Sequence, residues 1–232
     1  MDTVRKDILK LEPYIAGKPI EETKRQLGLK DVIKLASNEN PLGASSMAIA
    51  AIKKALNAVN RYPDSRGFCL KRKLAKFYNL NPSNFVLGNG SDELIDVVIK
   101  TFVEPDESII SAEATFLEYG IIARSNGRRI IEVPLKYYKY DLEAIRNKID
   151  KKTKLVFIAN PNNPTGTYVT RYELKGFIDA LPQNVVVVLD EAYDTFIDVD
   201  DFPNSLSHIR GKNFIILKTF SKAYGLAGLR LG

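Results

Sequence analysis

The sequence is poor in the residues that most often build metal sites, disulfides and nucleophilic triads. Its 232 residues include one Cys, one His and no Trp. The lone Cys69 cannot form an intramolecular disulfide and fits a reducing compartment. One His and one Cys also exclude zinc sites built from several such ligands, and any triad would have to use His208. We therefore expect no metal, and chemistry that depends on Lys, Tyr, Asp, Glu, Arg or a bound cofactor.

Long apolar runs and clusters of one charge sign are also missing. The purest apolar run, Val185–Leu189, is far shorter than the roughly 20 residues that span a bilayer. The first residues lack the apolar segment of a signal peptide. The 34 Lys and Arg exceed the 28 Asp and Glu by 6, but this excess is spread along the chain and forms no block typical of nucleic-acid binding. We expect a cytoplasmic protein that binds neither membrane nor nucleic acid, with a charge balance that suits phosphorylated small molecules.

From about Pro41 onward, short apolar runs alternate with segments of helical period. This alternation predicts an α/β fold, with a mostly parallel sheet flanked by helices on both faces. The expected strands are Phe85–Leu87, Glu107–Ser111, Arg129–Val133, Leu155–Ala159, Val185–Leu189 and Phe214–Leu217. The expected helices are Ser46–Val59, Gly67–Tyr78, Asp92–Phe102, Phe116–Ser125, Leu142–Ile149 and Arg171–Leu181.

The two ends of the chain differ from this pattern. Residues 1–40 carry two small amphipathic stretches around Pro13 and Pro19, and we interpret them as an N-terminal arm or small-domain segment. Residues 41–232 are then a large domain. Its last part, Phe214–Gly232, consists of a predicted strand and a loop with no closing helix, so we expect the chain to be truncated and this domain to be incomplete.

Ligands of open α/β sheets bind beyond the carboxyl ends of the strands, and two loops there are rich in Gly, Asn and Pro. In Gly88–Glu93, glycines and the free amides of a helix start can hold a phosphate. The alternative is a plain turn in which Ser91 or Asp92 caps the helix. Asn160–Gly166 is a rigid loop that either presents an amide to a ligand or is an ordinary multi-turn connection.

Two further loops carry charged residues. Asp190 follows five apolar residues, and a carboxylate there needs a cation or hydrogen-bond donors. A cationic ring nitrogen is one such partner, and a helix N-cap is the alternative. Lys222 follows the last predicted strand among hydroxyls and glycines, with Arg230 further on. Most lysines are solvated surface charges, but one held in this place can have a lowered pKa and act as a nucleophile. Together the four loops supply what pyridoxal 5′-phosphate requires.

These segments resemble the fold-type I pyridoxal-phosphate aminotransferases. Within that family they are most similar to the histidinol-phosphate aminotransferases. The resemblance implies transamination between L-histidinol phosphate and 2-oxoglutarate, giving imidazole acetol phosphate and L-glutamate, in histidine biosynthesis. An aromatic or broad-specificity aminotransferase, a threonine-phosphate decarboxylase and an inactive cofactor-domain fragment stay open as alternatives. The matching segments are Leu35–Gly43, Arg61–Asp64, Gly88–Glu93, Asn160–Gly166, Leu189–Tyr193 and Thr219–Gly232.

The resemblance also implies roles for individual residues. Lys222 forms an imine with the cofactor and relays the proton between the substrate α-carbon and the C4′ atom of the cofactor. Asp190 pairs with the pyridine nitrogen, while Asn163 and Tyr193 hydrogen-bond the phenolic oxygen of the ring. Phe116 stacks on the ring, with plain core packing as its alternative. The phosphate is held by Ser91 and Asp92, largely through their backbone amides, and by Thr219, Ser221 and Arg230.

Three more residues concern the partner subunit and the substrate. By the resemblance, Tyr62 reaches the cofactor phosphate of a neighbouring subunit, which implies a homodimer with shared sites. Tyr14 and Asn38 fall in the part of the family that covers the substrate, with arm packing and turn formation as the alternative.

The sequence departs from the family pattern in two places. The proline that many relatives place before the Thr-aromatic pair is missing ahead of Thr115. The family also continues for ~100 residues beyond the position of Gly232, and that part carries an arginine expected to grip the substrate and most of the small domain.

Overall fold

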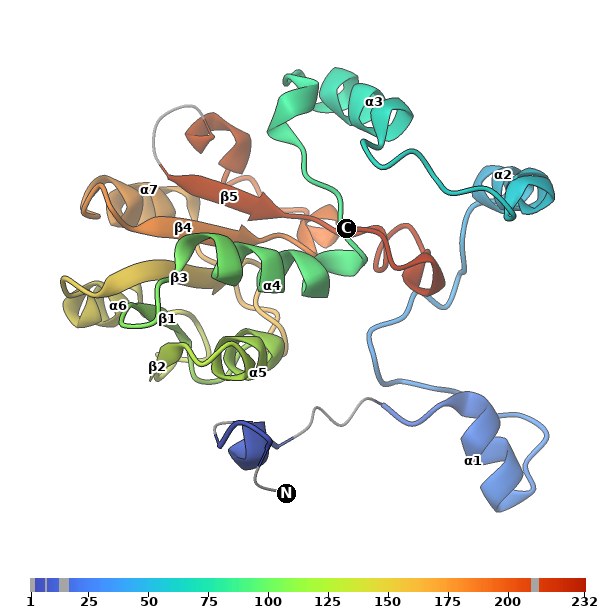
Figure 1. The fold of residues 1–232 in the computed structure, drawn as a ribbon, viewed down its shortest axis with the longest axis horizontal. Helices are drawn as coiled ribbons and strands as arrows, with labels where there is room; N and C mark the ends of the chain where they lie inside the picture. The colour runs from blue at the N-terminus through green and yellow to red at the C-terminus, as the bar shows by residue number, and fades with distance from the viewer. Residues whose placement is uncertain (1–2, 7, 13–16, 210–212) are drawn as a thin grey trace.

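The computed structural model describes residues 3–6, 8–12, 17–209 and 213–232. Its centre is a five-stranded sheet in the order β2-β1-β3-β4-β5, in which all neighbouring strands are parallel (Figure 1). The predicted α/β class is therefore confirmed. The strands are β1 (Ser108–Ala112), β2 (Arg129–Val133), β3 (Thr153–Ala159), β4 (Val186–Asp190) and β5 (Phe214–Leu217).

The burial of each strand follows from its place in the sheet. All residues of β1 and β4 are buried, and so are all residues of β3 except Lys154. These are the strands that read as nearly continuous apolar runs, as strands covered on both faces do. The edge strand β2 instead exposes Arg129 and Glu132. Hydrophobic burial in the middle of the sheet thus fixes the scaffold that carries the loops.

Helices cover both faces of the sheet. Helices α4 (Gly90–Phe102) and α5 (Glu118–Ser125) pack against each other in front of it, and α6 (Leu142–Lys148) and α7 (Arg171–Asp179) pack against each other behind it (Figure 1). The apolar stripe of α4, including the fully buried Ile95 and Ile99, enters the core. This arrangement places the start of α4 at the carboxyl edge of the sheet.

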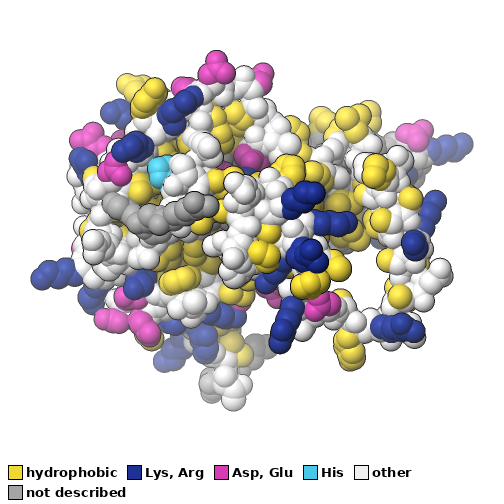
Figure 2. Space-filling model, turned by 90° about the horizontal axis from the view of Figure 1, so that it is seen from above, with side chains coloured by type: hydrophobic (Ala, Val, Ile, Leu, Met, Phe, Trp, Pro, Cys, Tyr) yellow, Lys and Arg dark blue, Asp and Glu magenta, His cyan; other side chains and the backbone are white. Residues whose placement is uncertain are grey.

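The N-terminal part of the chain lies away from the sheet. It contains α1 (Ile20–Leu27), α2 (Ser46–Ala55) and α3 (Phe68–Tyr78), of which only α3 buries a residue, Ala75 (Figure 1). Figure 2 shows hydrophobic side chains exposed here among Lys and Arg. The boundary at residue 40 stays a prediction. Short 3-10 helices complete the described structure at Ile8–Lys10, Leu56–Ala58, Pro82–Asn84, Asp194–Phe196, Ser205–His208 and Ala227–Leu229.

One predicted strand is wrong. Phe85–Leu87 is extended but joins no sheet, and Val86 is exposed. The backbone that follows pairs with the end of the chain: the Gly88 amide donates to the Gly232 carbonyl at 3.1 Å, and the Gly232 amide donates back at 3.1 Å. An apolar run shows that a segment is extended, but not which segment it pairs with.

No helix in the described ranges has both the length and the apolar character needed to cross a membrane. No group of three or more His, Cys, Asp and Glu side chains in those ranges is placed to hold a metal ion.

Candidate active site

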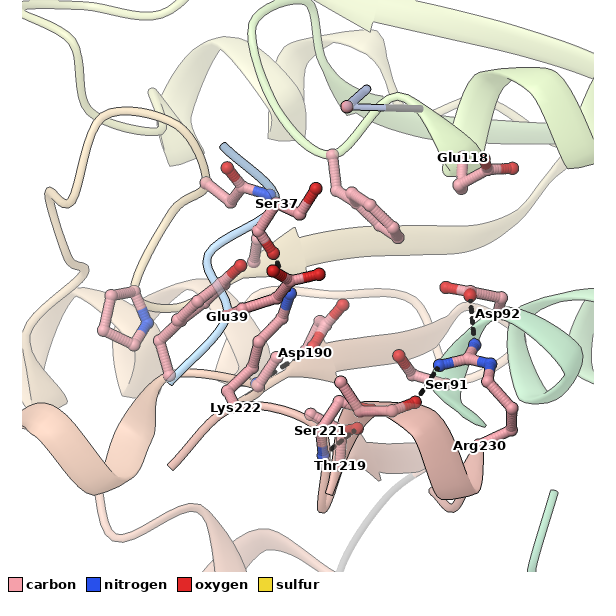
Figure 3. Close-up of a pocket in the computed structure, with 18 of the residues that line it drawn as sticks. Ser37, Glu39, Ser91, Asp92, Glu118, Asp190, Thr219, Ser221, Lys222 and Arg230 are labelled. Atoms are coloured by element: carbon pink, nitrogen blue, oxygen red, sulfur yellow. Dashed lines mark hydrogen bonds and ion pairs between the residues drawn. The ribbon is translucent and has the colours of Figure 1, made fainter. Parts of the chain in front are cut away.

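A cavity of about 420 Å³ opens at the carboxyl edge of the sheet, where the loops after β3, β4 and β5 meet the start of α4 (Figure 3). This volume is typical of a site for a small molecule or cofactor. The structure brings together ten of the predicted site residues around it. They are Ser91, Asp92, Phe116, Asn163, Asp190, Tyr193, Thr219, Ser221, Lys222 and Arg230. Their individual roles stay predictions.

Asp190 is the last residue of β4 and is 5% exposed. Its Oδ2 accepts a hydrogen bond from the Tyr119 hydroxyl at 2.6 Å, and its Oδ1 accepts one from the Ala192 amide at 3.0 Å. Burial raises the pKa of Asp190, and the hydrogen bond from Tyr119 opposes that rise. The N-cap alternative is wrong, because no helix begins after Asp190 until the short one at Asp194. The carboxylate is instead held by two neutral donors at the wall of the cavity.

Lys222 reaches the cavity from the loop after β5. Its Nζ donates to the Ser37 carbonyl at 3.1 Å and lies 5.6 Å from the centroid of the Tyr193 ring (Figure 3). The Asn38 side-chain amide donates to the Tyr193 hydroxyl at 2.9 Å. A segment of the N-terminal arm therefore covers the two residues expected to hold the reactive end of a ligand.

The start of α4 forms one wall of the cavity. Asn89 occupies the N-cap, and Ser91 and Asp92 lie within the first turn. The alternative that Ser91 or Asp92 caps the helix is therefore wrong. The free amides of this turn and the positive end of the helix dipole favour an anion. Arg230 adds a positive charge, and its Nη2 donates to Asp92 at 2.9 Å.

Gly90 makes this approach of Arg230 possible. Its φ is +79°, and a Cβ there would lie 2.6 Å from Nη2 of Arg230. Thr219 and Ser221 contribute hydroxyl groups close by, with the Ser221 amide donating to Thr219 Oγ1 at 3.1 Å. The wall therefore offers backbone amides, hydroxyls and a guanidinium, which is the donor set that phosphate requires.

Phe116 lines the cavity and also packs against the core, and its stacking on a cofactor ring stays a prediction. Its loop is tied to the loop of Asn163 through the neighbours of both residues. Thr115 Oγ1 donates to Asn162 Oδ1 at 2.8 Å, and Asn162 Nδ2 donates to the Ala114 carbonyl at 3.1 Å. These two hydrogen bonds, one buried and one partly buried, fix the position of the Phe116 loop relative to the Asn163 loop.

Three predicted residues are not among those that line the cavity. Tyr62 is fully exposed and lies outside its lining. Asn38 does not line the cavity either, but its side-chain amide donates a hydrogen bond to the lining residue Tyr193. Tyr14 lies outside the described residues.

Ser37 and Glu39 also line the cavity, and both belong to the segment Leu35–Gly43 that carries part of the resemblance. The lining residues Glu118 and Tyr119 were not predicted from the sequence. For Tyr119 a signal was present, because it stands three positions after Phe116, a spacing that brings side chains together at a helix start. For Glu118, no local pattern distinguishes it from an ordinary surface position.

A partly buried ion-pair cluster ties together the loops below the cavity. Nζ of Lys218 lies 2.7 Å from Oε2 of Glu191 and also contacts the Asp194 carboxylate. Burial alone would lower the pKa of Lys218, but these two carboxylates raise it well above its usual value. Lys218 is therefore charged and ties the end of β5 to the turn after Asp190. Because it does not line the cavity, we assign it a structural role.

A parallel sheet with a carboxylate, a lysine and an anion-binding helix start at its carboxyl edge is the architecture of a cofactor-dependent α/β enzyme. Residues 30–232 match the family described as aminotransferase class I and II. The chain belongs to this family.

The individual relatives are more specific. Histidinol-phosphate aminotransferase from Moorella thermoacetica is 47% identical, over 98% of this chain and 60% of its own length. The enzyme of the same name from Anaeromyxobacter sp. is 45% identical, over 100% of this chain and 64% of its own length. The crystal structure of histidinol-phosphate aminotransferase from Sinorhizobium meliloti in complex with pyridoxal 5′-phosphate gives a TM-score of 0.90 at 30% identity, over 100% of this chain and 62% of that chain. The chain is thus similar to histidinol-phosphate aminotransferases along its whole length, and spans about 60% of the length of these relatives.

Proposed function

We propose that this chain forms the cofactor-binding part of a pyridoxal-phosphate-dependent aminotransferase. The observation that carries the proposal is that Lys222, Asp190 and the anion-binding start of α4 face one cavity. The donor set fits the cofactor at both ends. Asp190 is a buried carboxylate with neutral donors, which suits a cationic ring nitrogen, and the start of α4 with Arg230 suits the phosphate.

When bound, the cofactor supplies an electron sink for the carbanion that forms at the substrate α-carbon. In our proposal Lys222 holds the cofactor aldehyde through Nζ and moves the proton at that α-carbon. Asp190 keeps the ring nitrogen protonated, while Asn163 and Tyr193 hydrogen-bond the phenolic oxygen. Phe116 stacks on the face of the ring.

The remaining roles concern the phosphate and the cover of the site. Ser91, Asp92, Thr219, Ser221 and Arg230 bind the cofactor phosphate. Asn38 and Tyr14 belong to the arm that covers the substrate, and the hydrogen bond from Asn38 to Tyr193 supports this for Asn38.

The proposed reaction is transamination of L-histidinol phosphate with 2-oxoglutarate, in the cytoplasm. The relatives named above support this choice of substrate. We further propose a homodimer in which Tyr62 reaches the cofactor phosphate of the neighbouring subunit. Support comes from the full exposure of Tyr62, whose hydroxyl is free to reach another chain.

The first test is an absorbance spectrum of the purified protein with pyridoxal phosphate. We expect a visible band from the covalent link to Lys222, and its complete loss in Lys222→Ala. Lys175→Ala is the matched control, because Lys175 is exposed on α7, does not line the cavity and pairs with Asp179 on the same helix; it should keep the band. A wild-type protein without the band would contradict the proposed cofactor.

The second test concerns the amino donor. Single turnovers with L-histidinol phosphate, phenylalanine and threonine phosphate should convert the first of these at least tenfold faster than the others, a difference of 1.4 kcal/mol in the barrier. Equal rates with phenylalanine would favour an aromatic or broad-specificity aminotransferase. Release of carbon dioxide from threonine phosphate would favour a decarboxylase.

A further inference from the structure

Tyr119 is the most completely enclosed polar side chain at the wall of the cavity. It lies in the first turn of α5 and is 1% exposed. Its ring stacks on that of Phe157, with centroids 4.8 Å apart and planes inclined by 12°. Because Phe157 belongs to the central strand β3 and is itself fully buried, the Tyr119 ring has a fixed position relative to the sheet.

This fixed ring contacts two residues that face the cavity. Its hydroxyl donates to Asp190 Oδ2 at 2.6 Å, and its edge meets the ring of Phe116 at a centroid distance of 5.6 Å and an angle of 85°. In the proposed function, Asp190 pairs with the ring nitrogen of the cofactor and Phe116 stacks on the ring face. One rigid tyrosine therefore connects the two side chains that would hold the cofactor ring, at its nitrogen and on its face.

The hydrogen bond also limits how Asp190 can turn. The Ala192 amide holds Oδ1 and the Tyr119 hydroxyl holds Oδ2, so the two oxygens cannot exchange places without breaking both bonds. A carboxylate oxygen has more than one acceptor direction. The directions that remain at the cavity are thus fixed before any ligand arrives, which is the condition for strong charge-assisted binding.

We propose that Tyr119 is a positioning residue for the cofactor, which orients the Asp190 carboxylate toward the ring nitrogen and supports Phe116 against the ring face. This inference rests on the proposed function and adds to it a residue that bonds to neither the reacting atoms nor the phosphate. It acts through Asp190 and Phe116.

The test uses Tyr119→Phe, which keeps both ring contacts and removes only the hydroxyl. We expect the Kd for pyridoxal phosphate to rise about tenfold, the effect of losing one hydrogen bond to a charged group. With cofactor labelled with ¹⁵N in the ring, the nitrogen resonance should also move, because the carboxylate that faces it has lost a donor. A merely structural role would lower the melting temperature and leave that resonance in place.

Tyr168→Phe is the matched control. Its hydroxyl also donates to an aspartate, Asp201 Oδ1 at 2.7 Å, but Tyr168 does not line the cavity; its Kd and resonance should equal those of the wild type. In an Asp190→Asn background, Tyr119→Phe should have less than half of its effect on Kd, since the proposed route runs mainly through the carboxylate.

Two outcomes separate this inference from the proposed function. A wild-type protein that binds no pyridoxal phosphate would overturn both. Wild-type binding with an unchanged Kd and resonance in Tyr119→Phe would overturn the role of Tyr119 alone. Should Tyr119→Phe fail to fold, 3-fluorotyrosine at this position keeps the hydroxyl and makes it a stronger donor. The nitrogen resonance should then move from its wild-type position, and an unchanged resonance would overturn the inference.

Discussion

The sheet region, residues 90–232, and the N-terminal region, residues 17–89, use their apolar side chains in opposite ways. In the sheet region Leu155 and Phe157 are fully buried, and most of the Ile and Val of the strands are buried. In the N-terminal region Leu35 is 91% exposed and Leu42 is 92% exposed. Helices α1 and α2 bury no residue at all. The sheet region closes its own core, and the N-terminal region leaves its apolar surface open.

The difference separates stability from completion of the site. The sheet region holds Asp190, Lys222 and the start of α4 without help, because β4, β5 and α4 belong to one packed core. The N-terminal region reaches the site through a few hydrogen bonds, from Asn38 to Tyr193, from Asn40 to the Ala223 carbonyl and from Lys222 to the Ser37 carbonyl. Its exposed apolar side chains suit the neighbouring subunit that we propose for Tyr62. We therefore expect substitutions in the two regions to differ in kind.

The largest contrast is expected from one matched pair of core and surface substitutions. Leu155→Ala removes a fully buried side chain from β3 and should lower the free energy of unfolding by about 2–5 kcal/mol. Leu42→Ala removes a side chain that is 92% exposed and should change it by less than about 0.5 kcal/mol. Urea unfolding of both variants, followed by circular dichroism at low protein concentration, measures the difference.

A second measurement at high protein concentration sharpens this comparison. If a neighbouring subunit covers Leu42, its substitution should weaken association while leaving the unfolding of the dilute protein unchanged. A large loss of stability in dilute Leu42→Ala would contradict the distinction between the regions.

A smaller effect of opposite sign is expected at Asp190. Burial raises the folded-state pKa of Asp190 above its usual 3.8, so the unfolded chain releases this proton at a lower pH than the folded chain does. Asp190 therefore stabilises the fold less and less as the pH rises above 3.8 toward its folded pKa. In Asp190→Asn the amide oxygen can accept from the Ala192 amide, and the amide nitrogen can donate to the Tyr119 hydroxyl. This variant should be more stable than the wild type by about 1 kcal/mol at pH 7. It should also lose affinity for pyridoxal phosphate.

Urea unfolding between pH 4 and pH 8 tests this sign. The advantage of Asp190→Asn should grow as the pH rises and vanish at the acidic end. Asp201→Asn is the control, since Asp201 is part-buried and does not line the cavity. An Asp190→Asn protein that is less stable than the wild type at pH 7 would show that the carboxylate contributes to the fold as well as to the site.

The same contrast between regions explains what the sequence could predict. Strands β3 and β4 were predictable because strands buried on both faces need continuous apolar runs. Asp190 and Lys222 were predictable because polar residues after such runs lie at the ligand-binding edge of the sheet. All five observed strands overlap predicted ones, and ten predicted site residues line the cavity.

What was missed depends on contacts between segments that are distant in the chain. Lys222 Nζ and the Ser37 carbonyl are 185 positions apart, and no local pattern encodes that approach. Phe85–Leu87 has the pattern of a strand, but whether it pairs with another strand depends on which segments of the chain lie beside it. Tyr119 reads as an ordinary core aromatic until its hydroxyl is seen to meet Asp190, 71 positions away. Local pattern thus predicts elements, and their spatial assembly decides which residues meet.

The smallest expected effect tests the link between the two regions. Asn38→Ala removes the hydrogen bond from the Asn38 amide to the Tyr193 hydroxyl, which is exposed to water. Because water replaces the lost partner, the free energy of unfolding should change by at most about 0.5 kcal/mol. Amide hydrogen exchange of residues 36–40 should nevertheless become several times faster, because so few contacts hold this segment over the cavity.

The control is Asn213→Ala, which loses an exposed hydrogen bond to the Gln183 carbonyl within the sheet region and should leave that exchange unchanged. Equal exchange in Asn38→Ala and the wild type would mean that the bonds of Ser37 to Lys222 and of Asn40 to the Ala223 carbonyl hold the arm on the site without Asn38.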